Sequence, residues 1–152
     1  MSNYFFDTSA LVKIYHKEVG TELVEEIYEN PENTIYISHL TKVELISALC
    51  KKYRTNDISH EAFILAYDKF LADCINVFQL IFFYSDLLEE AKELILQYGQ
   101  TKELRTLDAI QLATYQETLN EDCYFVCADN KLFMLLQSIG VKLYPLNAVK
   151  ER

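Results

Sequence analysis

The alternation of apolar and polar positions divides the chain into short and long segments. Short runs rich in β-branched and aromatic residues predict strands, and longer segments whose apolar residues recur every three or four positions predict helices. After Ser38, for example, Val43, Ile46, Leu49 and Tyr53 fall at helical spacing, and Ser38 is a suitable N-cap for that helix. The predicted strands are residues 3–6, 34–37, 76–82, 124–128 and 142–144, and the predicted helices are residues 8–16, 21–29, 39–52, 58–73, 86–98, 104–119 and 131–139.

Strands and helices alternate along the chain, and this order is typical of a parallel sheet with helices on both faces. We therefore expect an α/β protein, a three-layer α/β/α sandwich with a central, mainly parallel sheet of about five strands. The length of 152 residues is that of one domain, and three glycines and two prolines leave no obvious flexible linker. The whole chain, residues 1–152, is expected to fold as a single domain.

The charge balance narrows the functional classes. Asp and Glu number 23 against 14 Lys and Arg, a net charge of −9, which argues against nucleic-acid binding through phosphate neutralisation alone. A solubilising surface, a basic partner or carboxylates gathered around a metal ion would each explain the acidity. No apolar run approaches the ~20 residues of a membrane span, and no signal-peptide pattern is visible. The four cysteines match no zinc template, so we expect reduced thiols in a cytoplasmic protein.

Two aspartates stand where strands are predicted to end. Asp7 directly follows the first predicted strand and Asp129 the fourth, and each opens a predicted helix. Ligands of open parallel sheets bind outside the carboxyl ends of the strands, so both side chains are expected at the functional edge. Aspartate is also a good N-cap, and that structural role is the stronger explanation of either residue taken alone.

Two further acids lie within predicted helices. Asp108 belongs to a helix that is apolar around most of its circumference, where an unpaired carboxylate would be strongly unfavourable. It needs a partner, and Arg105, three residues earlier, is one candidate. Glu44 follows the second predicted strand by one to two helical turns. A solvated Glu is the ordinary interpretation there, although small residues at positions 47 and 48 leave room for a ligand beside it.

These four acids predict a metal centre if they converge. Two carboxylates about 6 Å apart repel each other by about 3 kcal/mol at an effective dielectric constant of about 20. A divalent cation would relieve that repulsion, and hard oxygen ligands favour Mg²⁺ or Mn²⁺ over zinc. Such a site suits hydrolysis of a phosphodiester bond, because the metal generates a hydroxide near neutral pH and neutralises the phosphate.

The residues around the four acids resemble a known family. They are the segment DTSALVK at residues 7–13, Glu44 early in a helix, the segment LRTLDAIQLA at residues 104–113 and the segment CADNKL at residues 127–132. Together they resemble the four acidic motifs of PIN-domain ribonucleases and, within that family, the VapC-like toxins of type II toxin–antitoxin modules. The resemblance covers nearly the whole chain. Cys127 departs from it, because a Ser or Thr is frequent two residues before the last acid.

The resemblance implies a Mg²⁺- or Mn²⁺-dependent endoribonuclease. Asp7 and Asp108 would be the principal metal ligands. Glu44 and Asp129 would complete the acidic pocket by binding a second metal ion or by orienting the attacking water. Candidate contacts to the metal or to RNA phosphates are Thr8, Lys13, Arg105, Thr106 and Lys131, although capping or packing explains the two threonines equally well.

The resemblance also implies partners. A cognate antitoxin is expected, and a basic segment carrying an Arg would suit the carboxylate pocket of an acidic toxin. A homodimer is expected as well. Two alternatives remain: a non-catalytic PIN module that binds RNA or a protein partner, and a stand-alone nuclease without an antitoxin. The three histidines form no catalytic set and no nucleotide-binding glycine motif occurs, so other enzyme classes lack support.

Overall fold

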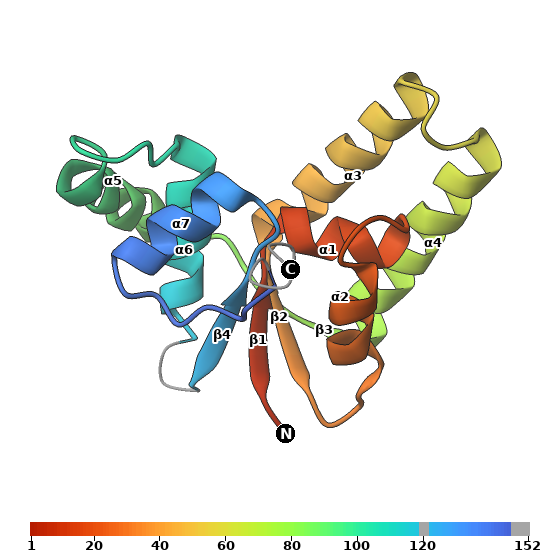
Figure 1. The fold of residues 1–152 in the computed structure, drawn as a ribbon, viewed down its shortest axis with the longest axis horizontal. Coiled ribbons are helices and arrows are strands. Elements are labelled where there is room, and N and C mark those ends of the chain that lie inside the picture. The colour runs from red at the N-terminus through yellow and green to blue at the C-terminus, as the bar shows by residue number, and fades with distance from the viewer. Residues whose placement is uncertain (119–121, 147–152) are drawn as a thin grey trace.

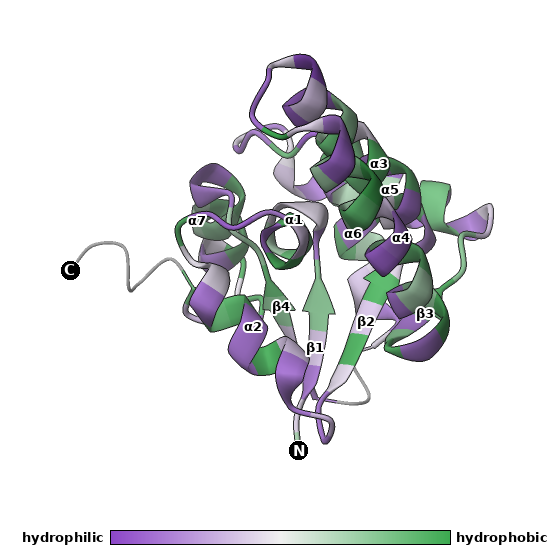
Figure 2. Ribbon diagram, turned by 90° about the vertical axis from the view of Figure 1, so that its right-hand side faces the viewer, coloured by the Kyte–Doolittle hydropathy of each residue, from purple (hydrophilic) through white to green (hydrophobic). Residues whose placement is uncertain are grey.

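A parallel sheet forms the centre of the molecule (Figure 1). The computed structural model describes residues 1–118 and 122–146, and its four strands follow the order β3 (Phe78–Ile81), β2 (Thr34–Ser38), β1 (Asn3–Phe6) and β4 (Cys123–Val126). The central strand is β1, whose Phe5 pairs with Tyr36 on one side and with Phe125 on the other. Because all four strands are parallel, their carboxyl ends meet at one edge, the upper edge in Figure 2.

Seven helices of the described residues cover the sheet in two groups (Figure 1). One face carries α5 (Asp86–Tyr98), α6 (Thr106–Gln116) and α7 (Asn130–Ser138), and the other carries α1 (Thr8–Tyr15), α2 (Thr21–Glu29), α3 (His39–Arg54) and α4 (His60–Asn76). The expected three-layer α/β/α sandwich is thereby confirmed.

Each face of the sheet has its own hydrophobic core. Phe5 of β1 packs in the core with α5, α6 and α7, whereas its neighbour Phe6 packs in the core with α1 to α4. In β4, Phe125 and Val126 divide in the same way. Successive side chains of a strand point to opposite faces, so a strand buried on both faces is a continuous apolar run. Figure 2 shows α1, α3 and α6 above the carboxyl ends of β1 and β2, where the loops and helix starts gather.

Most predicted elements are present with bounds that differ by at most three residues, and three of the differences matter for the fold. The helix predicted over residues 58–73 extends to Asn76 as α4, so β3 begins at Phe78 rather than at residue 76. The helix predicted from residue 104 begins at Thr106 as α6, and its predicted end at Leu119 lies outside the described residues. The prediction of about five strands was wrong, because residues 142–144 contribute a single bridge between Leu143 and Phe125.

The chain beside β4 fails to form a strand for a local reason. Phe125 donates its N–H to the carbonyl of Lys142, and Tyr144 donates its N–H to the carbonyl of Phe125. The next donor of a parallel ladder would be Leu146, but its N–H is directed back to the carbonyl of Tyr144 at 2.8 Å, so the pairing ends there. Among the helices that the structure describes, none is long and apolar enough to cross a membrane.

Candidate active site

Asp7 is held at the junction between β1 and α1. It is the N-cap of α1, and its Oδ1 accepts hydrogen bonds from the N–H of Ala10 at 3.1 Å and from the hydroxyl of Ser9 at 2.7 Å. The Ser9 hydroxyl accepts in turn from the N–H of Ala128, just beyond β4, at 2.9 Å. The residue is only 6% exposed, and no described group donates to its Oδ2. The cap and the candidate site therefore use different oxygens of one carboxylate.

Asp129 repeats this arrangement after β4. It is the N-cap of α7, and its Oδ1 accepts from the N–H of Leu132 at 3.0 Å. Its Oδ2 accepts from Nη2 of Arg105 at 3.5 Å. The two alternatives considered for these aspartates, a cap and a functional residue, are compatible in the folded chain.

Asp108 lies in the first turn of α6 rather than in the interior of a helix. Because α6 begins at Thr106, the carboxylate is close to the helix N-terminus, where the helix dipole favours negative charge. Its Oδ2 accepts from Nε of Arg105 at 3.1 Å. The ion pair expected three residues apart is therefore present, and the same guanidinium also reaches Asp129.

Glu44 is held by hydrogen bonds from two other helices. It lies in the second turn of α3, and its Oε1 accepts from the hydroxyl of Thr8 at 3.0 Å and from Nε2 of Gln111 at 2.8 Å. Thr8 belongs to α1 and Gln111 to α6, so three helices meet at this carboxylate. Glu44 is consequently not the solvated helix residue that its isolated sequence context favours.

The four acids line one cavity of about 160 Å³. It lies at the carboxyl edge of the sheet, where Asp7 and Asp129 follow their strands. The volume corresponds to several water molecules at about 30 Å³ each, which is room for a hydrated cation. The lining residues are Asp7, Thr8, Ser9, Glu44, Arg105, Asp108, Gln111, Asp129 and Leu132.

Burial perturbs two of these carboxylates. Removal from water raises the pKa of Asp7 from 3.8 to about 7, although the hydrogen bonds from Ser9 and Ala10 oppose this, and the charges of Asp108 and Glu44 add to the rise. Burial also raises the pKa of Asp108, while the hydrogen bond and charge of Arg105 act against it. A second positive charge in this cavity would favour the ionised form of both groups.

The donor set fits a hard divalent cation, because carboxylate oxygens are the ligands that such ions prefer. Across residues 1–118 and 122–146, however, no three His, Cys, Asp or Glu side chains are already arranged to hold a metal ion. Arg105 instead provides the positive charge next to Asp108 and Asp129. Binding a cation at all four acids therefore requires side-chain movement, including movement of this guanidinium.

Three predicted contact residues lie away from the cavity. Lys13 is 5% exposed, and its Nζ donates to Glu18 at 3.0 Å and to the carbonyl of Val19 at 2.7 Å. Lys13 follows Asp7 by six residues, which corresponds to about 600° of helix rotation, or one full turn and two thirds of the next. Its side chain therefore does not point in the direction of Asp7. Thr106 lies two residues before Asp108 on α6, so its side chain is rotated by about 200° from that of Asp108. It is exposed and lines an apolar hollow beside α5. Lys131 is exposed in the first turn of α7 outside the cavity lining.

Sequence reasoning missed Gln111 as a site residue. Its side chain is 3% exposed, and its Nε2 donates to Glu44 and to the hydroxyl of Thr41 at 2.9 Å. A signal was present: Gln111 is three residues after Asp108, hence on the same face of a helix that is otherwise apolar there.

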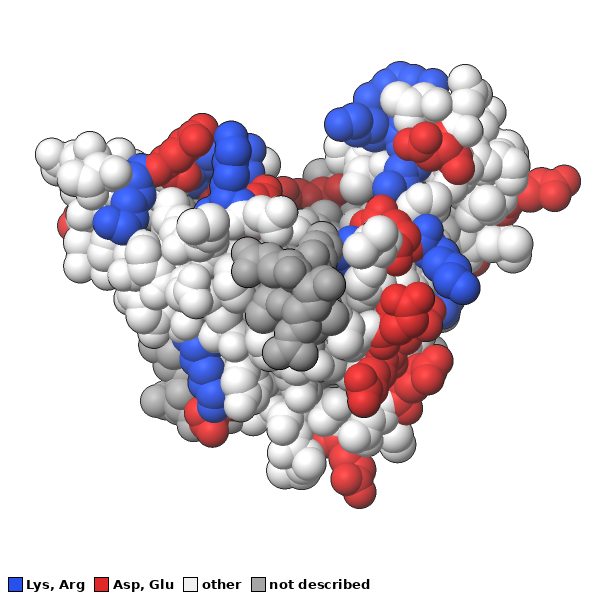
Figure 3. All heavy atoms as spheres, in the orientation of Figure 1, with Lys and Arg blue, Asp and Glu red and all other residues white. Residues whose placement is uncertain are grey.

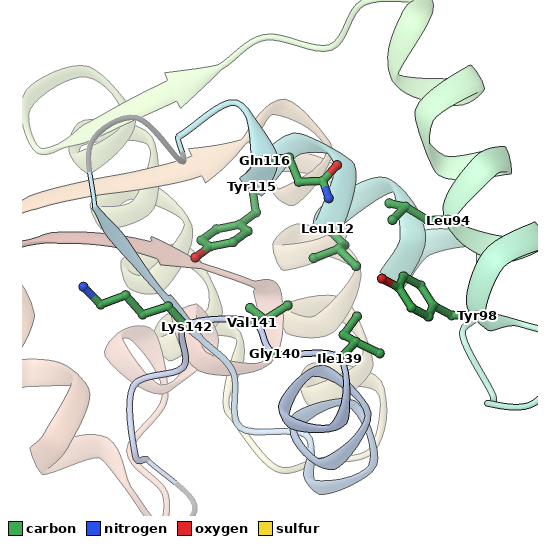
Figure 4. Close-up of a pocket in the computed structure, with 9 residues that line it drawn as sticks. All are labelled: Leu94, Tyr98, Leu112, Tyr115, Gln116, Ile139, Gly140, Val141 and Lys142. Atoms are coloured by element: carbon green, nitrogen blue, oxygen red, sulfur yellow. The ribbon is translucent and has the colours of Figure 1, made fainter.

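A second cavity, of about 240 Å³, has a different character. Figure 4 shows Leu94, Leu112 and Ile139 gathered around it, while the amine of Lys142 points away from them. No carboxylate lines this cavity, so it offers no comparable metal ligands.

Comparison with known families and structures identifies the family and the fold. The model of the PIN domain family matches residues 4–130. No curated protein sequence matches the chain significantly. The fold resembles that of FitAcB from Neisseria gonorrhoeae, with a TM-score of 0.67 and 15% identity over 94% of this chain and 97% of that one.

Two further structures share the fold. One is VapC20 of Mycobacterium tuberculosis, a toxin that cleaves the sarcin–ricin loop, with a TM-score of 0.64 and 16% identity over 92% of this chain and 96% of that one. The other is VapBC2 of Rickettsia felis bound to a DNA fragment from its promoter, with a TM-score of 0.62 and 20% identity over 93% of this chain and 97% of that one. The expected resemblance to VapC toxins is confirmed at the level of the fold.

Proposed function

Because the chain belongs to the PIN-domain family, we propose that it is a metal-dependent endoribonuclease that hydrolyses RNA phosphodiester bonds, and that it is the toxin of a toxin–antitoxin module. One observation carries the catalytic part of this proposal: four acids from four separate segments line a single cavity at the carboxyl edge of the sheet. A non-catalytic PIN module would not require all four carboxylates, so we favour the enzyme over that alternative.

The four acids have distinct proposed roles. Asp7 and Asp108 would be the principal ligands of Mg²⁺ or Mn²⁺, and Glu44 and Asp129 would hold a second ion or orient the attacking water. When bound, the cation supplies Lewis-acid chemistry by activating water and neutralising charge on the phosphate. With a pKa of about 7, Asp7 holds a proton in a large fraction of cation-free molecules at neutral pH and releases it when positive charge arrives.

Arg105 is the proposed contact to the substrate. Of the side chains that line the cavity within the described part of the chain, it is the one that carries a positive charge, and its side chain is 63% exposed. A guanidinium presents a planar set of donors that suits phosphate oxygens. We propose that Arg105 neutralises Asp108 and Asp129 in the free protein and contacts an RNA phosphate in the complex, with Lys131 and Thr8 as further contacts.

The proposed RNA strand would bind at the surface around the site despite the net negative charge. Figure 3 shows a notch between the two groups of helices, with acidic and basic side chains on both of its walls. Local basic groups beside a cation-filled pocket would offset the repulsion that the overall charge of −9 exerts on phosphate. An RNA substrate of this kind would place the activity in the cytoplasm.

A cleavage assay tests the catalytic proposal. We expect the purified protein to cut a labelled RNA in Mn²⁺ or Mg²⁺ and not in EDTA, and Asp108→Asn to lose at least ~100-fold in rate while keeping its fold. Asp68→Asn, which removes one charge from an exposed position on α4, is the matched control and should cut normally. Cleavage that survives both EDTA and Asp108→Asn would contradict the assignment.

The toxin role and its partners need separate tests. The solved structures that share this fold include toxin–antitoxin complexes, and this supports an antitoxin as partner. We expect induced synthesis of the wild-type chain to arrest bacterial growth, the product of the adjacent reading frame to relieve the arrest and co-purify, and light scattering to give a homodimer. Arrest by Asp108→Asn would argue against RNA cleavage as the cause, and a nuclease without a co-purifying partner would favour the stand-alone alternative.

A further inference from the structure

Both hydrogen bonds that hold Glu44 end on the same oxygen. Thr8 and Gln111 donate to Oε1, at 3.0 Å and 2.8 Å, and no described group donates to Oε2. Glu44 lines the cavity, so Oε2 is the oxygen left for a ligand. We propose that Gln111 is a positioning residue that fixes Glu44 with Oε2 available to the cation, an inference that rests on the metal-dependent function proposed above.

The orientation of the Gln111 amide is determined by its surroundings. One N–H of Nε2 is directed to Glu44 and the other to Thr41, whose hydroxyl is also hydrogen-bonded to that of Ser38 at 3.1 Å. Turning the amide over would bring its carbonyl oxygen against the carboxylate, and two acceptors would then face each other. The series of hydrogen bonds that runs from Ser38 through Thr41 to Gln111 and Glu44 therefore permits one arrangement of the amide.

Gln111 also connects two parts of the fold that have different cores. Leu45, beside Glu44 on α3, packs in the core on one face of the sheet, and Leu112, beside Gln111 on α6, packs in the core on the other face. Asp108 is one turn before Gln111 on α6. The hydrogen bond from Gln111 thus fixes Glu44 relative to the helix that carries Asp108, a proposed principal ligand.

Stability alone does not explain an amide at this position. The carbonyl oxygen Oε1 of Gln111 is buried and has no hydrogen-bond partner among the described residues. A buried acceptor without a partner is unfavourable, and an apolar side chain of similar shape, such as Met, would leave no such acceptor. An amide that is unfavourable for packing yet bonded to a site carboxylate is typical of a residue retained for positioning.

Calorimetric titration of Mn²⁺ into the RNA-free protein tests this role. We expect Gln111→Met to bind Mn²⁺ at least ~10-fold more weakly than wild type, to lower kcat for RNA cleavage and to leave KM within about twofold. Met removes the unpaired Oε1 and also the two hydrogen bonds that Nε2 donates, so these effects on the thermal midpoint oppose each other and Mn²⁺ affinity is the deciding measurement. In Gln111→His, Nε2 stands four bonds beyond Cα as in Gln, so its N–H should restore most of the affinity.

Thr114→Val is the matched control. Thr114 is buried on the same helix, and its hydroxyl donates to the carbonyl of Ile110 at 2.7 Å without touching Glu44. It should bind Mn²⁺ as wild type does. Wild-type affinity in Gln111→Met, or an equal loss in Thr114→Val, overturns this inference alone. A wild-type protein that binds no Mn²⁺ overturns the metal assignment and this inference with it.

A measurement on the unmodified chain decides the matter if Gln111→Met does not fold. The side-chain amide protons of Gln111 can be assigned through bonds by NMR and followed during Mg²⁺ titration. The inference predicts that both shift and saturate with the affinity that a calorimetric titration of Mg²⁺ gives, because they report on the carboxylate that binds the ion. Amide protons that stay unshifted while Mg²⁺ binds overturn it.

Discussion

Removing the buried charge of Asp7 should stabilise the protein at neutral and alkaline pH. The side chain ionises near pH 3.8 in an unfolded chain and near pH 7 in the folded one, because burial disfavours the charged form. Well below pH 3.8 the group is neutral in both states and contributes nothing. As the pH rises toward 7, the unfolded chain gains the ionised form first, so the folded state loses stability. Asp7→Asn avoids this loss and still accepts hydrogen bonds as an N-cap.

The size of the effect follows from the two pKa values. Raising the pKa of Asp7 from 3.8 in the unfolded chain to about 7 in the folded one lowers the free energy of unfolding by about 4 kcal/mol at pH 8 and by about 1.5 kcal/mol at pH 5. These values use ~1.4 kcal/mol per tenfold change in the ionisation constant. The amide nitrogen of Asn also loses water on folding, so the expected gain in the free energy of unfolding at pH 8 is about 2–4 kcal/mol.

Urea denaturation at pH 5 and pH 8 measures this difference. Asp7→Asn should unfold at higher urea than wild type at pH 8, and the gap should narrow at pH 5. Saturating Mg²⁺ should also narrow it, because an ion that binds only the folded wild type stabilises that protein. Asp68→Asn, at an exposed position, should show neither effect. Equal or lower stability of Asp7→Asn at pH 8 in EDTA would refute the reasoning.

Three further predictions concern the same cavity. Because Asp7 must lose its proton to bind a cation, calorimetric Mn²⁺ affinity should rise as the pH approaches about 7 and level off above it, and an affinity independent of pH from 6 to 8 would contradict the raised pKa. Arg105→Gln removes the guanidinium that contacts Asp108 at 3.1 Å, so the variant should bind Mn²⁺ several-fold more tightly. The salt dependence of its RNA binding should fall by about one phosphate contact. Weaker Mn²⁺ binding would mean that Arg105 instead supports the ligands. Burial raises the pKa of the Cys127 thiol, so mass spectrometry should find it unmodified by iodoacetamide in the native protein while the exposed Cys50 reacts, and equal labelling of both would contradict its burial.

The fold was predictable wherever the information was local. The transitions from β1 to Asp7 and from β4 to Asp129 can be recognised from adjacent residues, because each is an apolar run followed by a capping acid. The fifth strand was not predictable in this way, because the ladder with Phe125 ends where the N–H of Leu146 turns back to the carbonyl of Tyr144. Sequence spacing alone places a strand-like segment without showing how many hydrogen bonds it makes.

The site was predictable in its acids and less so in their neighbours. The acids could be identified because together they match the four acidic motifs of PIN-domain ribonucleases, although a cap or a solvated residue explains three of them taken alone. The direction of a side chain depends on helix rotation and on partners from elsewhere, and for this reason Lys13 pairs with Glu18 instead of reaching the cavity. Gln111 was missed because the sequence does not distinguish a buried glutamine from a solvated one. Its role depends on Glu44 and Thr41, which the fold brings next to it.

The double use of Asp7 and Asp129 limits how this protein can lose its activity over evolution. Each carboxylate caps a helix through one oxygen and leaves the other toward the cavity, so most substitutions would damage folding and chemistry together. Asn and Ser are exceptions, because both cap helices well and neither supplies a carboxylate. Descendants that become binding proteins should therefore carry Asn or Ser at these two positions, and their scaffold would survive the change intact.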